Sequence, residues 1–147
     1  MTDETTTYVA ITRLQAAYAD VVTRRSWSEL DALFVVDASI RIDTVTRPVV
    51  ELTGATALGE FISSAVSRFE FFEFVILNTV IDIGDQKSAT GRLWMVEVRQ
   101  EHDGTWSNAF GRYDDAYTHV DGSWRFAQRR YRSIARRIGN DPATIFT

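Results

Sequence analysis

The chain has no cysteine and only two histidines among its 147 residues. Without cysteine there is no disulfide framework, no thiolate metal site and no cysteine nucleophile. The two imidazoles, at His102 and His119, supply fewer nitrogen ligands than a zinc site normally needs. We therefore expect neither a metal nor a cofactor. Because each histidine lies beside an Asp-Gly turn, we expect both to be exposed.

Excess positive charge and long apolar runs are also missing. The net charge of −4 argues against a general nucleic-acid binder, although arginines crowd the C-terminal part of the chain. No apolar run approaches the roughly 20 residues of a membrane span. The opening Met-Thr-Asp-Glu-Thr lacks a basic-then-apolar signal. We therefore expect a cytoplasmic protein that binds neither nucleic acid nor a membrane.

Apolar and aromatic residues, in contrast, are plentiful. The composition is 45% hydrophobic and 12% aromatic. A chain of this length and composition suits one domain with a single core, which we expect to span residues 1–147. The weakly patterned tail, residues 134–147, is expected to cover either a pocket mouth or a dimer interface.

The strongest local signal is the Asp-Gly pair, found at Asp103-Gly104 and at Asp121-Gly122. Asp-Gly between strand-like runs marks a hairpin, because the turn requires positive φ and glycine provides it without steric cost. Together with the β-branched and aromatic residues upstream, these turns predict a meander of four long strands. The predicted strands span residues 71–83, 88–101, 105–119 and 123–133.

Helical patterns occupy the first half of the chain. Apolar spacing and a capping-box sequence predict helices over residues 5–25, 26–34 and 55–69, and short strands over 39–44 and 49–52. Because helices and strands are segregated, we expect an α+β fold. We expect a cone-shaped, curved antiparallel sheet of four long strands plus the short strands, closed by three helices around an internal cavity. Such a cavity is a plausible small-molecule site.

Four features of the sequence occur together: the helical stretch 14–38, Asn78 and Ala89 on the middle strands, residues 111–115 and the hairpin residues 121–125. In these features the sequence resembles the SnoaL-like polyketide-cyclase branch of the nuclear transport factor 2-like superfamily. The resemblance implies a fold shared by scytalone dehydratase, a dehydrochlorinase, ketosteroid isomerase, polyketide cyclases, limonene epoxide hydrolase and members without catalytic activity. The dehydratase-like members use an Asp–His pair. The matching positions here are Thr23 and Phe74, so the dehydratase mechanism is not implied.

Several side chains are candidates for the site. Ala109, Gly111 and Tyr113 alternate on one strand face, where the two small residues leave room beside the tyrosine. Arg129 either pairs with Asp115 or Asp43, or holds an anionic oxygen of a ligand. The candidate catalytic residues are Tyr18, Asn78, Tyr113, Arg129 and Tyr131. The candidate lining residues are Val22, Thr23, Phe34, Phe61, Phe74, Trp94, Ala109 and Gly111.

Alternatives accompany these candidates. Asn78 is either a hydrogen-bonded core amide or a ligand contact, and Tyr18 is either core packing or a cavity hydroxyl. We interpret Trp94, Val96 and Val98 as apolar lining, which makes Glu97 and Arg99 outward-facing. The outer face would then show Phe110, and with it Trp106, Trp124 and Phe126. Such an apolar face predicts a homodimer packed sheet to sheet.

We therefore expect a cofactor-independent enzyme of cyclase, isomerase or dehydratase type, acting on an apolar polyketide- or terpenoid-like substrate without the Asp–His pair. The alternative is a non-catalytic ligand-binding or oligomerising module of the same fold. A third interpretation, an epoxide hydrolase, requires an Asp–Arg–Asp cluster, for which Asp43, Arg129 and Asp115 are the available residues.

Overall fold

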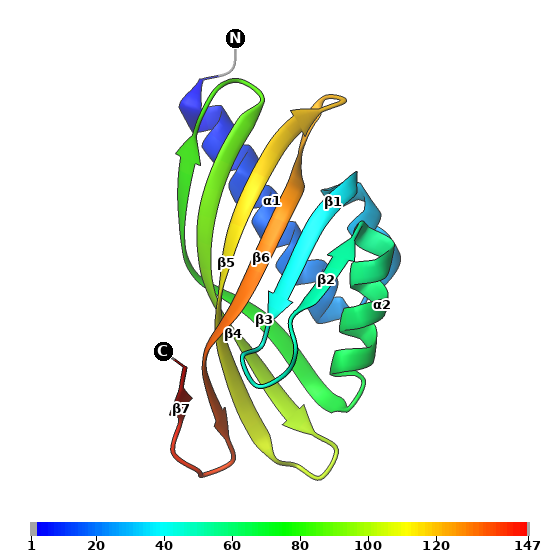
Figure 1. Cartoon of the computed structure of the whole chain (residues 1–147), viewed down its shortest axis with the longest axis vertical. Helices are drawn as coiled ribbons and strands as arrows, with labels where there is room; N and C mark the ends of the chain where they lie inside the picture. The colour runs from blue at the N-terminus through cyan, green and yellow to red at the C-terminus, as the bar shows by residue number, and fades with distance from the viewer. Residues whose placement is uncertain (1–2, 147) are drawn as a thin grey trace.

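The computed structural model describes residues 3–146 as helices on one side of a long curved sheet (Figure 1). The helical elements are α1 (Glu4–Arg24), the 3-10 helix η1 (Trp27–Leu33) and α2 (Ala55–Val66). The strands are β1 (Phe34–Asp43), β2 (Val50–Thr53), β3 (Phe69–Ile83), β4 (Ser88–Glu101), β5 (Trp106–Val120), β6 (Ser123–Ile138) and β7 (Thr144–Ile145). The α+β class and the segregation of helices from long strands are confirmed.

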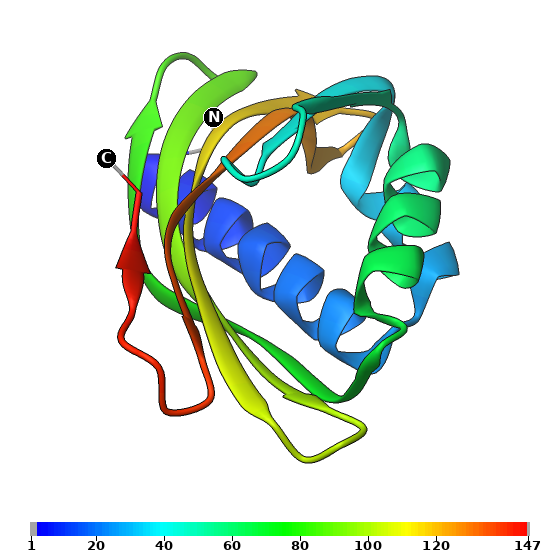
Figure 2. The ribbon, with the colours of Figure 1, turned by 60° about the horizontal axis from the view of Figure 1, so that its bottom comes forward.

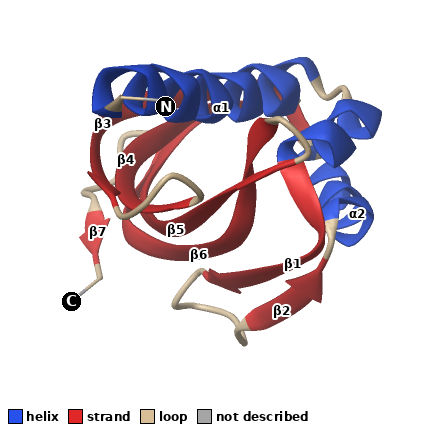
Figure 3. Cartoon of the chain, turned by 90° about the horizontal axis from the view of Figure 1, so that it is seen from above, coloured by secondary structure: helices blue, strands red, loops and turns tan. Residues whose placement is uncertain are grey.

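The sheet has the strand order β2-β1-β6-β5-β4-β3, with β7 added beside β6. Strands β3 to β6 follow one another in antiparallel order, as the Asp-Gly turns predict. Strand β1 instead pairs in parallel with β6, so the sheet is mixed. The sheet curls around α1, while α2 lies beside β1 and β2 (Figures 2 and 3).

Turn geometry sets the register of the long strands. Asp121 and Gly122 have φ of 50° and 81°, the pair of positive values that a tight hairpin requires. The β5–β6 register then shifts at two places, one of them where Tyr117 pairs with Phe126 and Ala116 with Gln128. This shift is a bulge in the last strand, because Ala127 has no partner on β5. It brings Phe126 and Arg129 to the same, inner face.

The core lies between α1 and the inner face of the sheet. Helix α1 begins at the N-cap Asp3, whose carboxylate accepts a hydrogen bond from the Thr6 amide at 2.7 Å. Its apolar stripe buries Ile11, Leu14 and Tyr18. Trp124 and Phe126 are also buried, at 9% and 0% exposure, so their expected outer-face position is wrong. The bulge between Phe126 and Gln128 is the reason, because it brings both side chains to the inner face together with Arg129.

The C-terminal tail extends the sheet. Strand β1 pairs with β6 only as far as Arg132. Beyond that residue β7 pairs with β6 in its place, with Ile145 opposite Ala135. The guanidinium of Arg136 lies 5.5 Å from the Phe146 ring. Among the helices within residues 3–146, none is long and apolar enough to cross a membrane.

Candidate functional site

Strand register places the functional side chains on the inner face of the sheet. Residues that pair directly across neighbouring strands point to the same side. Gly91, Asp115 and Arg129 form one row across β4, β5 and β6, and Leu93, Tyr113 and Tyr131 form the next. Two rows further along, Glu97, Ala109 and Arg136 stand side by side. Two carboxylate–arginine pairs therefore occupy the interior.

The first pair, Asp115–Arg129, is enclosed completely. The two side chains are 0% and 1% exposed. Arg129 donates through Nε to Asp115 Oδ1 at 2.8 Å and through Nη2 to Oδ2 at 3.1 Å. The Tyr117 hydroxyl donates to Oδ2 at 3.0 Å and accepts a hydrogen bond from Gln15 Nε2 at 2.8 Å. The carboxylate of Asp115 therefore has a full set of donors.

Aromatic rings surround the guanidinium of Arg129. Its central carbon lies 3.8 Å from the centre of the Tyr113 ring, 4.3 Å from that of Tyr18 and 4.2 Å from that of Phe126. Burial alone would lower the pKa of Arg129, but Asp115 and the adjacent tyrosines outweigh it and raise that pKa. The cation is therefore permanent, yet its Nη1 is buried with no hydrogen-bond partner among the described residues. Such an orphan donor is uncommon in a folded protein.

The second pair, Glu97–Arg99, is less enclosed. Arg99 is 8% exposed and Glu97 23%, with 3.2 Å between Arg99 Nη1 and Glu97 Oε1. Arg99 also donates through Nε to Ser107 Oγ at 3.0 Å and lies over the Phe69 ring at 4.8 Å. Burial raises the pKa of Glu97, against attraction from Arg99 and Arg136. The expectation that Glu97 and Arg99 face outward is wrong.

The sequence held a signal that would have placed Glu97 correctly. The turn at Asp103-Gly104 pairs the Glu101 amide with the Thr105 carbonyl at 2.9 Å. Counting outward from this turn brings Ala109 opposite Glu97. Because Ala109 was expected to face inward, its partner Glu97 had to do so too. The choice of Trp94 as lining conflicted with that register.

Most of the expected site residues lie in the interior. The buried ones are Tyr18, Val22, Phe34, Phe74, Ala109, Gly111, Arg129 and Tyr131. The half-buried ones are Thr23, Phe61 and Tyr113. Thr23 and Phe74 are neighbours, because Thr23 Oγ1 accepts a hydrogen bond from the Phe74 amide at 3.0 Å. His102 is exposed beside Glu70, as expected, whereas His119 is half-buried against Trp124, so its expected exposure is wrong.

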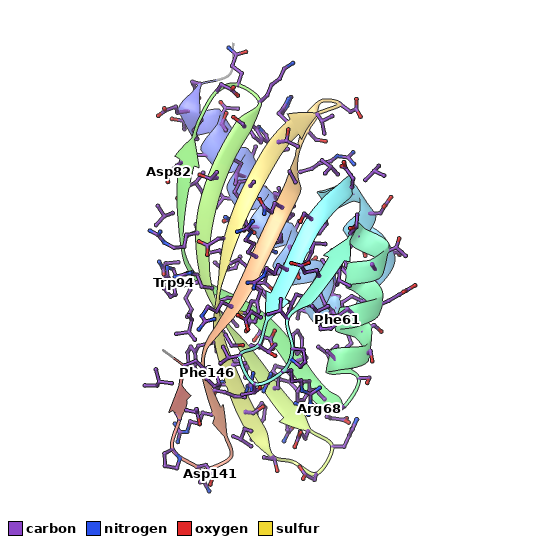
Figure 4. The ribbon with its side chains drawn as sticks, in the orientation of Figure 1. Phe61, Arg68, Asp82, Trp94, Asp141 and Phe146 are labelled. Carbon is purple, nitrogen blue, oxygen red and sulfur yellow. The ribbon has the colours of Figure 1, made fainter. Side chains whose placement is uncertain are left out.

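Asn78 and Trp94 do not line the interior. The β3–β4 register shifts between Ile76 and Asn78, so Asn78 pairs with Trp94 on the outer face, where Asn78 is exposed. The Arg112 guanidinium lies 5.6 Å from the Trp94 ring on that face, and Figure 4 shows Trp94 at the flank of the sheet remote from α2. Val96 and Val98 alternate with Glu97 and so also point outward.

Two further expectations need correction. The room predicted beside Gly111 is occupied, because a Cβ added there would lie 2.2 Å from Cε1 of the Tyr131 ring. The Asp–Arg–Asp cluster does not form either, because Asp43 Oδ2 binds Arg132 Nη1 at 2.9 Å while Arg129 binds Asp115 alone. The interior therefore has separate pairs instead of one shared cluster.

Two surface hollows accompany these interior pairs. A hollow of about 390 Å³ lies on the outer face of the sheet, lined by residues such as Arg92, Asp114 and Arg130. A groove of about 670 Å³ runs between η1 and α2. Neither is lined by Glu97 or Arg129. Residues 3–146 contain no group of three or more His, Cys, Asp or Glu that could hold a metal ion.

Comparisons with known proteins agree on the fold. A family model described as SnoaL-like domain matches residues 3–130. The Kfla4162 protein from Kribbella flavida superposes with a TM-score of 0.80 at 19% identity, covering 92% of this chain and 95% of its own. The hexachlorocyclohexane dehydrochlorinase LinA-type3 from Novosphingobium barchaimii gives 0.80 at 15% identity, with 96% and 95% covered.

A candidate scytalone dehydratase from Novosphingobium aromaticivorans is a further structural neighbour. It superposes with a TM-score of 0.78 at 22% identity, covering 94% of this chain and 91% of its own. None of the curated protein sequences matches the chain. Identities at this level establish a shared fold and leave the reaction to be argued from the site.

Proposed function

The chain belongs to the SnoaL-like domain family, and on that premise we propose that it is a cofactor-independent enzyme of cyclase, isomerase or dehydratase type. The substrate is an apolar, oxygen-bearing molecule of polyketide or terpenoid kind. One observation carries the proposal: Arg129 is a permanent cation inside the apolar core, and its Nη1 has no partner within residues 3–146. A fixed charge in a dry site is the arrangement that stabilises negative charge developing on an oxygen.

The tyrosines supply the donors. Burial raises the pKa of Tyr18 and Tyr113, and it raises the pKa of Tyr131 to about 12. All three hydroxyls are therefore protonated at neutral pH and can donate a hydrogen bond to a carbonyl oxygen. Arg129, which contacts the rings of Tyr18 and Tyr113, lowers the pKa of both hydroxyls, but burial outweighs it. Preorganised donors and proximity can lower a cyclisation or isomerisation barrier substantially.

The reaction proceeds without the Asp–His pair of the dehydratase-like relatives. Thr23 and Phe74 stand at the matching positions, and the Thr23 hydroxyl already accepts a hydrogen bond from the Phe74 amide. Neither side chain can take up a proton near neutral pH. The rival function, a non-catalytic ligand-binding module, is favoured by this replacement and by the close packing of Tyr131 on Gly111.

Turnover of linear polyketide-like ketones and terpenoid ketones separates the two functions. We expect product from the wild type and a loss of about 100-fold in kcat for Tyr113→Phe, which removes only the donor. The control is the double variant His102→Ala/His119→Ala, which we expect to stay within a few-fold of the wild type. Binding without product across the whole panel would instead support the non-catalytic module.

We further propose a cytoplasmic homodimer packed sheet to sheet. Phe71, Trp106 and Phe110 are 41%, 51% and 38% exposed on the outer face, and the first two rings are 5.6 Å apart. Large aromatics gathered on one surface mark interaction sites. Light scattering at micromolar concentration should give about twice the chain mass of 16.7 kDa, and the monomer mass would contradict this proposal.

A further inference from the structure

We propose that Glu97 is the proton-transferring residue of this interior, and that its substrate is an apolar carbonyl compound with an acidic C–H bond next to the carbonyl. The inference rests on the proposed function, because it names the residue that takes over from the absent Asp–His pair. It stands on the placement of Glu97, on its neighbours and on its incomplete hydrogen bonding.

Glu97 keeps one carboxylate oxygen free. Its Oε1 lies 3.2 Å from Arg99 Nη1, whereas Oε2 has no hydrogen bond within residues 3–146. The side chain retains 23% of its surface although it projects from the middle of the inner face. A base must reach the proton that it removes, and a carboxylate saturated with donors cannot. Glu97 is thus the interior acid that combines access with an unused oxygen.

Arg99 holds Glu97 in a fixed direction. Its guanidinium is bound by Ser107 Oγ at 3.0 Å and lies 4.8 Å over the Phe69 ring, so it cannot swing away freely. A base aimed by a rigid partner loses less conformational freedom when the substrate arrives. Arg99 is therefore a positioning residue.

The surroundings of Glu97 suit an apolar carbonyl compound. Glu97 pairs with Phe74 on β3 and with Ala109 on β5. Phe74 places an aromatic ring on one side of the carboxylate, and Ala109 places only a methyl group on the other. The charged and titratable groups that act on Glu97 are Arg99 on β4 and Arg136 on β6. The charge of Glu97 also contributes to the raised pKa of three tyrosines, which are Tyr18 on α1, Tyr113 on β5 and Tyr131 on β6. Burial raises the pKa of Glu97, which brings its basicity closer to what proton transfer at neutral pH needs.

The step is balanced within the substrate. Glu97 Oε2 takes a proton from the carbon next to the carbonyl, and the C–H electron pair becomes the C=C bond of an enolate. The carbonyl oxygen takes the negative charge and accepts a hydrogen bond from a tyrosine hydroxyl. Return of the same proton to another carbon completes an isomerisation, and no oxidant or reductant is consumed.

A nitrobenzisoxazole tests the base without knowledge of the natural substrate. A carboxylate removes its ring C–H proton, the C–H electron pair forms a nitrile, the N–O bond breaks and a coloured phenolate leaves. We expect the wild type to exceed acetate at equal carboxylate concentration, with a rate that rises as Glu97 ionises. Glu97→Gln should lose about 100-fold, together with that pH dependence.

The controls keep every outcome informative. Glu73→Gln removes an exposed carboxylate of β3 and should leave the rate unchanged. Glu97→Asp keeps a carboxylate and should retain part of the rate, which guards against misfolding of the glutamine variant. A wild-type rate equal to acetate, or a Glu97→Gln variant as fast as the wild type, would overturn the assignment. The nitrobenzisoxazole assay does not depend on the natural substrate. It therefore tests Glu97 as a base even if none of the ketones that test the proposed function is turned over.

Discussion

The interior of this protein holds two carboxylate–arginine pairs that differ in how completely the carboxylate is satisfied. Asp115 is 0% exposed and receives three hydrogen bonds, two from Arg129 and one from Tyr117. Glu97 is 23% exposed and receives one, from Arg99. In the first pair the unused group is a nitrogen of the arginine, and in the second it is an oxygen of the carboxylate.

This difference assigns different tasks to the two pairs. A saturated, fully buried carboxylate cannot take part in proton transfer, but it can hold a cation against three aromatic rings. A half-satisfied and accessible carboxylate contributes less to the fold and is free to exchange a proton. The first pair thus provides a fixed charge, and the second provides proposed acid–base chemistry in the same interior.

The largest predicted effect is on the Asp115–Arg129 pair. Asp115→Asn leaves the Arg129 cation buried without its counter-charge and should cost about 3–5 kcal/mol in the free energy of unfolding. The matched control is Asp114→Asn on the same strand, whose side chain is 48% exposed and pairs with Arg112, and it should cost below about 1 kcal/mol. Urea unfolding measures both values.

A double variant sharpens this result. Asp115→Asn/Arg129→Met removes both charges, so it should be less destabilised than the sum of its single variants. Equal losses for Asp114→Asn and Asp115→Asn would show that the buried pair does not have the structural task assigned to it here.

The next effect concerns Gly111, which lies on β5 between the two pairs. Gly111→Ala places a Cβ where the Tyr131 ring now lies, so the ring must move, at about 1–3 kcal/mol. In a Tyr131→Leu background the branched chain leaves the ring position empty, and the same change should cost much less. Thermal unfolding of the four proteins tests this, and an equal cost in both backgrounds would refute ring contact as the cause.

The sequence predicted the frame of the molecule because local signals determine it. The Asp-Gly turns set the four long strands, and the apolar stripe around Tyr18 set α1. Two bulges, however, are not encoded by any single residue, and each one reverses the alternation of faces between the side chains before it and those after it. One moves Asn78 to the surface, and the other moves Trp124 and Phe126 into the core.

The candidate site was predicted less well than the fold, for a related reason. Arg129, Tyr18 and Tyr113 were found because large polar groups among small inward residues are conspicuous. Glu97 was missed because a charged residue next to a tryptophan is easily interpreted as the exposed one. Only the strand register, counted from the Asp103-Gly104 turn, settles which of the two faces inward.

The smallest predicted effect is the pH dependence that Glu97 contributes to stability. Burial raises its pKa in the folded state above the unfolded value of about 4.3. The folded protein therefore binds this proton more tightly, and its stabilising contribution is complete below the unfolded pKa and is lost as the pH rises through the folded pKa. The Glu97→Gln variant cannot ionise at this position. As the pH rises from the unfolded to the folded pKa of Glu97, the wild type should therefore lose unfolding free energy relative to the variant.

Urea titrations at successive pH values measure the difference, with Glu73→Gln as the exposed control. A difference that stays flat, or shifts in favour of the wild type, would show that folding does not raise the pKa of Glu97, and the carboxylate would then lose the raised basicity proposed for it.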